Sequence, residues 1–179
     1  MTNHLINVKS STPDSSRTRQ STSLLKLVVF TIGNLNLALR IELVYKVVNH
    51  TSTYGSGLGA VGITHLNEGE ITVLDLHQRL LKTNPVSESK SNGYLVVVQN
   101  KIGELYGIPV AETPALIEVP LSMIRVLPES YRRADTLDVA THVAVIPQDE
   151  TPLTVFLLDV DRLLPLFQNL SLEGKTDYL

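Results

Sequence analysis

Cysteine is missing from the 179-residue sequence, which excludes a disulfide framework, a thiolate metal site and a cysteine nucleophile. Tryptophan is also missing, and aromatic residues make up only 5% of the chain. Positive charge is in short supply, because 15 Lys and Arg stand against 18 Asp and Glu, for a formal net charge of −3. Barrels that bind single-stranded nucleic acid need stacking aromatics and a basic groove. We therefore expect no nucleic-acid partner.

Long apolar runs are absent as well. The longest, such as residues 94–98, are about five residues long, whereas a membrane-spanning helix needs about 20. The first residues show neither the basic start nor the apolar stretch of a secretion signal. Hydrophobic residues nevertheless make up 43% of the chain, which is enough for a sizeable core. These features predict a globular cytoplasmic protein that does not insert into the membrane.

Two composition breaks frame the folded part. Nine of the 14 residues 10–23 are Ser or Thr and none is apolar, so residues 1–23 are predicted to form a disordered leader, either a plain solvated tail or a phosphorylation target. Residues 82–93 lack periodicity and contain a Pro and a Ser/Lys/Asn cluster, which predicts a linker. The folded domain is thus expected at 24–170, with modules at 24–81 and 94–166 and a C-terminal tail at 171–179.

Short strand-like segments separated by turn signals make up both modules. Leu35, Leu37, Leu39 and Ile41 alternate with other residues, so one face of that strand is expected to be buried. No helix long enough to connect parallel strands lies between the segments. The pattern predicts an all-β fold of small barrels rather than a doubly wound sheet. The other predicted strands are residues 24–30, 60–66, 71–74, 95–98, 105–110, 116–119, 143–146 and 155–158.

The two modules end alike. Residues 71–81 and 155–164 each consist of an apolar strand, an Asp, and a short helix with an Arg and paired leucines. The two aspartates, Asp75 and Asp159, stand 84 positions apart, and each is predicted to cap the N-terminus of a short closing helix. This internal repeat predicts two similar β modules packed side by side.

The residues that carry chemistry form no recognisable catalytic motif. Residues 57–62 match the dinucleotide pattern GxGxxG, but they neither follow a buried strand nor open a helix. The five histidines lack the spacing of a zinc site, and no GxSxG motif occurs. Glu68/Glu70 and Asp159/Asp161 are explained by a solvated hairpin and a helix N-terminus. We expect no catalytic, cofactor or metal site, although a carboxylate pair assembled by the fold remains open.

The opening of the folded part resembles CheW, the bacterial chemotaxis coupling protein, at residues 27–33, 37–41 and 44–47. Residues 62–66, leading into residues 71–76, look like the central strand pair of that family. The second half is similar to the family at residues 94–99, 107–110, 124–128 and 156–159. The resemblance extends from residue 24 to about residue 166, and the order and spacing of its motifs make it fairly specific.

This resemblance implies two five-stranded β-barrels with a hydrophobic groove between them. It implies a non-catalytic adaptor, with one surface for the cytoplasmic tip of a methyl-accepting receptor and another for the regulatory domain of a CheA-type histidine kinase. Recruitment to membrane-associated receptor arrays follows from such partners. The groove residues implied are Val44, Lys46, Val47, Thr64, His65 and Asn67. For Val44 and Val47, ordinary packing in the core is the alternative.

The chain departs from the family at some of these positions. Lys46 stands where the family usually has Glu, and Asn67-Glu68 replaces the usual Arg-Gly. Thr72 replaces a familiar Pro, and Ala111 replaces a usual Asp. The charges of a standard receptor contact are therefore missing.

The amino-acid sequences of two segments indicate a branch of the family. Thr64-His65-Leu66 and Thr141-His142-Val143 look closer to the divergent PixI-like adaptors of cyanobacterial phototaxis and pilus motility. Two other classes of function stay open: a small β-barrel that binds a ligand, an oligonucleotide or an oligosaccharide, and an enzyme with a site assembled by the fold.

Overall fold

The computed structural model describes residues 23–50, 53–55, 60–67, 69–81, 93–133 and 137–173. The predicted leader, apart from Ser23, lies outside the described residues, and so do most of the predicted linker, Glu68, half of the GxGxxG motif (residues 57–59), and residues 174–179 of the predicted tail.

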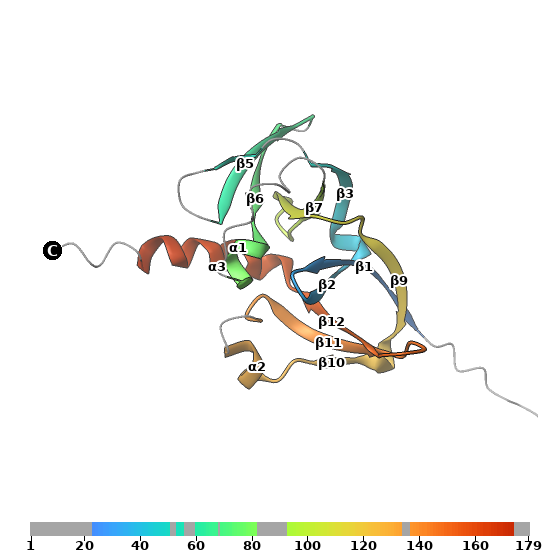
Figure 1. Ribbon diagram of the computed structural model, residues 1–179. Coiled ribbons are helices and arrows are strands. Elements are labelled where there is room, and N and C mark those ends of the chain that lie inside the picture. The colour runs from blue at the N-terminus through green and yellow to red at the C-terminus, as the bar shows by residue number, and fades with distance from the viewer. Residues whose placement is uncertain are drawn as a thin grey trace, which may run out of the picture.

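The all-β prediction is confirmed, because two six-stranded sheets dominate the fold (Figure 1). The first, sheet A, has the order β10-β11-β12-β2-β1-β9, and the second, sheet B, has the order β3-β7-β8-β6-β5-β4. The strands of sheet A are β10 Ile124–Val126, β11 Ala140–Ile146, β12 Leu153–Leu158, β2 Leu35–Arg40, β1 Leu24–Ile32 and β9 Ala115–Pro120. Those of sheet B are β3 Val44–Asn49, β7 Tyr94–Gln99, β8 Leu105–Val110, β6 Gly69–Leu74, β5 Val61–Leu66 and β4 Tyr54–Gly55.

Each sheet is built from both halves of the sequence. Strands β1 and β2 hydrogen-bond with β9 and β12 of the second half, and β7 and β8 hydrogen-bond with β3 and β6 of the first. The predicted modules at 24–81 and 94–166 therefore do not coincide with the two sheets. Each sheet also contains six strands, where the resemblance implies five.

The repeat predicted from the sequence is nevertheless present in the strand order. Read from β4, sheet B repeats sheet A position by position, with the β7–β8 hairpin in the place of the β1–β2 hairpin. Each sheet has one parallel and one antiparallel pairing between the halves. The parallel pairings place Phe156 opposite Leu37 in sheet A and Thr72 opposite Tyr106 in sheet B, and the antiparallel ones join β1 to β9 and β3 to β7. The two repeats have thus exchanged their first hairpins.

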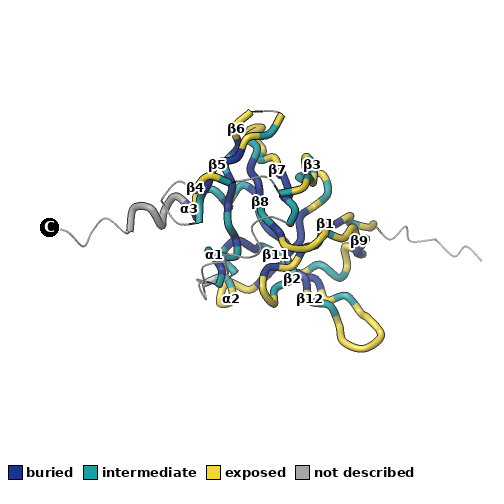
Figure 2. The backbone as a smooth tube through the Cα atoms, turned by 45° about the horizontal axis from the view of Figure 1, so that its top comes forward, coloured by how far each residue is buried: buried dark blue, intermediate teal, exposed yellow. Residues whose placement is uncertain are grey.

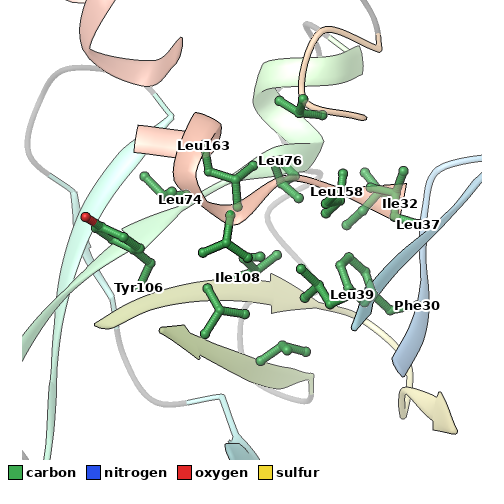
Figure 3. Close-up of a cluster of buried hydrophobic side chains, with 14 of the residues drawn as sticks. Phe30, Ile32, Leu37, Leu39, Leu74, Leu76, Tyr106, Ile108, Leu158 and Leu163 are labelled. Atoms are coloured by element: carbon green, nitrogen blue, oxygen red, sulfur yellow. The ribbon is translucent and has the colours of Figure 1, made fainter. Parts of the chain in front are cut away.

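This exchange buries both faces of each hairpin, as the dark blue stretches of β1 and β7 in Figure 2 show. One face packs into the core between the sheets, which includes Phe30 and Leu39 (Figure 3). The other face lines the core of its own sheet, with Val29 and Ala38 in sheet A. The prediction of a single buried face for residues 35–42 was wrong at Ala38, which is fully buried because it packs into this second core.

Three helices complete the fold: α1 Leu76–Leu81, α2 Glu129–Arg133 and α3 Val160–Glu173. Single 3₁₀ turns, η1 Ile41–Leu43 and η2 Leu121–Met123, precede β3 and β10. Asp75 Oδ1 accepts a hydrogen bond of 2.9 Å from Gln78 N, and Asp159 Oδ1 accepts one of 3.1 Å from Asp161 N. Both aspartates thus cap helices, but α3 has 14 residues and is longer than the short closing helix that the repeat predicts.

We expect Asp75→Ala and Asp159→Ala each to lower the free energy of unfolding by about 1 kcal/mol, because each removes the acceptor for an N-terminal N–H group. Urea denaturation measures this, with the exposed Asp149→Ala as a matched control that should change stability little. Binding of the folded fraction to the partners that the resemblance implies should stay unchanged. A variant with full stability but weakened partner binding would contradict the structural role.

Candidate functional site

An apolar groove of about 390 Å³ lies between strands β3 and β9, the end strands of the two sheets. It therefore opens at the junction of sheet A and sheet B. Its lining is aliphatic apart from a few neutral polar side chains, and no Asp, Glu, His, Lys or Arg takes part. The lining residues are Val28, Ile41, Val44, Val47, Val48, Asn49, Tyr94, Thr113, Pro114, Ala115 and Leu116.

The β3 wall of the groove is shaped by a β-bulge. Val44 and Lys46 pair with the successive residues Val98 and Val97, so Tyr45 is the extra residue. A bulge bends its strand and redirects the side chains around it. Val44 contacts the core between the sheets, whereas Val47 is 41% exposed. Core packing, the alternative for the two valines, thus applies partly to Val44 and not to Val47.

The β9 wall of the groove was not identified from the sequence. Leu116 of β9 is 59% exposed. It pairs with Val28 of β1, which forms part of the groove's floor. Residues 116–119 were recognised only as a strand. The available signal was the repeat, because β9 occupies in sheet A the place that β3 occupies in sheet B.

The predicted receptor-groove residues do not all come together. Val44 and Val47 line the groove, but Thr64, His65 and Asn67 belong to β5 and its hairpin. Strands β7, β8 and β6 separate β5 from β3 in sheet B, and Figure 1 shows β5 and β3 apart from each other. Thr64 is 1% exposed and cannot form part of a contact surface, so its assignment was wrong. His65 and Asn67 are exposed, away from the groove lining.

Charged side chains surround the groove without lining it. Lys26 Nζ lies 3.7 Å from Glu118 Oε1 across β1 and β9, and both side chains are more than half exposed. Lys46 is half-buried, with its Nζ 5.9 Å from the centroid of the Tyr45 ring. Exposed pairs of this kind contribute little to stability, so their charges affect mainly the choice of partner.

Carboxylates outside the groove are engaged in structural contacts. Lys101 Nζ lies 2.7 Å from Asp161 Oδ2, and this hydrogen bond lowers the pKa of Asp161 and raises that of Lys101. His65 Nε2 lies 2.9 Å from Glu70 Oε1. The Tyr106 hydroxyl donates to Glu104, and mainly burial raises the pKa of Tyr106 to about 12. Asp159 caps α3, so the Asp159/Asp161 pair has the structural use predicted for it.

The described residues contain neither a cluster of metal-binding side chains nor a helix suited to span a membrane. No group of three or more His, Cys, Asp or Glu is placed to hold a metal ion in that part of the chain. Among the helices that the structure describes, none has the length and apolar character needed to cross a membrane. The arrangement that remains is an apolar groove with charges around it, which suits the apolar surface of another macromolecule.

Comparison with known proteins identifies the family. The family model described as CheW-like domain matches residues 26–168. The crystal structure of the scaffolding protein TtCheW from Thermoanaerobacter tengcongensis is similar, with a TM-score of 0.61 and 21% sequence identity over 79% of this chain and 88% of that chain. No curated protein sequence matches the chain. The family match covers the two sheets and most of α3, and the chain belongs to the family of CheW-like domain proteins.

Proposed function

We propose that this protein is a non-catalytic signalling adaptor that couples methyl-accepting receptors to a CheA-type histidine kinase. The cytoplasmic tip of the receptor binds in the apolar groove between β3 and β9, and the regulatory domain of the kinase binds on another face. The observation that carries this proposal is the groove itself, because its exposed Val47 and Leu116 face solvent at the junction of the two sheets.

A helical receptor tip suits the chemistry of the groove. An amphipathic helix presents apolar side chains at positions i, i+3, i+4 and i+7, which an apolar groove can accept. A standard interface buries about 800 Å² on each partner, which is more than the groove walls alone supply. The surrounding charges, Lys46 and the Lys26–Glu118 pair, therefore belong to the same contact.

The alternative of a ligand-binding barrel has less support. The groove lining contains a single aromatic residue, Tyr94, and no cationic side chain. Binding of a nucleic-acid strand needs successive stacking surfaces and positive charge. A pull-down of the CheA-type kinase by the full chain tests the adaptor class directly, and failure to retain any kinase together with specific binding of an oligosaccharide would favour the alternative.

We expect Lys46→Glu to weaken binding to the protein's own receptor about three- to tenfold at low salt, because it reverses a charge beside the groove. The effect should shrink as the ionic strength rises. Titration calorimetry with the receptor tip at two salt concentrations measures it. Arg125→Glu, an exposed charge reversal on β10, is the matched control. Normal binding by the Lys46 variant at low salt would remove Lys46 from the contact.

The biological setting of the adaptor is a finer part of the proposal. The sequence of residues 64–66 and 141–143 supports a PixI-like role in phototaxis or pilus motility. The protein would then act in the cytoplasm at membrane-associated receptor arrays. Isolation of the full chain with its receptor from cells tests this setting, since a receptor that controls flagellar swimming would contradict it.

A further inference from the structure

The first 22 residues contain an apolar cluster outside the described part of the chain. Leu5, Ile6 and Val8 are close together in the sequence, and residues 9–22 that follow contain no aliphatic or aromatic side chain. Leu, Ile and Val in such a short stretch favour an extended conformation when a surface is available to cover them. The cluster joins the folded part at Ser23, directly before β1.

The groove lies within easy reach of this cluster. Ser23 O accepts a hydrogen bond from Leu121 N, which places the start of β1 beside the end of β9. From Ser23 to Val28 in the groove's floor the strand advances by five residues, or about 17 Å. A flexible chain of the length of residues 9–22 has a root-mean-square end-to-end distance of about 21 Å. A tether whose length matches the span gives an effective concentration in the millimolar range.

The groove also offers what an extended apolar segment requires. Strands β3 and β9 are the end strands of their sheets, and among the described residues each pairs with another strand along one edge only. An added strand can hydrogen-bond to such an edge and place alternate side chains in pockets. In a strand, Ile6 and Val8 point to the same side. Charge favours the contact too, because residues 1–22 contain Lys9, Arg17 and Arg19 against Asp14, whereas the chain as a whole is acidic.

We propose that residues 4–8 of this chain occupy the groove between β3 and β9 in the absence of receptor, with Ile6 and Val8 against its apolar lining. The segment thereby acts as a built-in competitor of the receptor tip. The docking stands on the groove and the tether alone, while the competition rests on the proposed function. The protein gains a regulated receptor site, because any receptor must displace residues 4–8 to bind.

Cross-linking in the full chain tests the docking, and the absence of native cysteine makes each engineered pair unique. Leu5→Cys is combined with Leu116→Cys in the groove, or with Val145→Cys on β11 as a control of similar exposure, 59% and 53%. We expect disulfide formation at least fivefold faster at position 116. Adding Ile6→Ser and Val8→Ser should abolish this preference without changing the tether. Equal rates at both positions, or a preference that survives the two serines, would overturn the docking.

Receptor binding tests the competition separately. The Ile6→Ser/Val8→Ser chain should bind the receptor tip about three- to tenfold more tightly than the unmodified chain. If the two serines leave receptor affinity unchanged, although Leu5→Cys without them cross-links preferentially to position 116, the competitor role is overturned. If Val47→Asp leaves receptor binding intact, the proposed receptor site fails while the cross-link still tests the docking. The two failures are therefore distinguishable.

Discussion

Replacing Val47 with Asp should reduce affinity for the receptor tip at least about a hundredfold. Val47 is 41% exposed on the β3 wall of the groove, so the free protein can solvate the new carboxylate and fold normally. In the complex the carboxylate would be buried against an apolar helix face without a partner, and burying an unpaired charge costs several kcal/mol. Titration calorimetry with the receptor tip measures the loss.

Ile63→Asp provides a matched control for this experiment. Ile63 is also 41% exposed and lies in the same sheet, but on β5, away from the groove lining. Its Asp variant should bind the receptor tip normally. Kinase binding of the Val47 variant should be unchanged, since the proposed function has the kinase bind another face. Equal losses in the two variants would show that the receptor does not distinguish the groove from the rest of sheet B.

Replacing Asp138 with Ala should lower the free energy of unfolding by about 3 kcal/mol. Asp138 Oδ2 lies 2.5 Å from Arg79 Nη2, and the Arg79 side chain is only 11% exposed. Arg79 belongs to α1, which follows β6 of sheet B, and Asp138 lies just before β11 of sheet A. The pair therefore joins the two sheets. Removing the carboxylate leaves the guanidinium charge poorly solvated and without its partner. An uncompensated charge of this kind lowers stability strongly.

A double variant separates the loss of the ion pair from the cost of leaving the Arg79 charge without a partner. Adding Arg79→Met to Asp138→Ala removes the uncompensated charge and should restore most of the stability, as measured by urea denaturation. Glu118→Ala breaks the exposed pair with Lys26 and should cost less than about 1 kcal/mol. If Asp138→Ala and Glu118→Ala had similar effects, the Arg79–Asp138 pair would not hold the two sheets together.

Part of the candidate site could be predicted from local pattern. Val44 and Val47 follow a strand-like segment that matches the family's opening, and both line the groove. Thr64 shows the limit of the same reasoning, because alternation along a strand separates two faces without telling which one meets the core. The β9 wall forms a groove only with β3, the opposite wall, which lies about 70 residues away in the sequence, so no local signal marks Leu116 as a groove residue.

Local sequence was sufficient for the class of fold and for its repeat. Short β-rich segments, turn signals and the recurring Asp before a helix all act over a few residues, so they can be recognised without knowledge of distant contacts. They yielded the all-β class, both helix caps and the similarity of the two halves.

The pairing of the halves depended on tertiary structure. A β1–β2 hairpin can hydrogen-bond to the remaining strands of its own repeat or to the equivalent strands of the other, since the backbone groups are the same in both cases. The exchanged arrangement buries Phe30 and Leu39 on one face and Ala38 on the other, in two different cores. Burial of apolar area in both cores is a property of the whole assembly. The groove exists only because this exchange brings the end strands of the two sheets together.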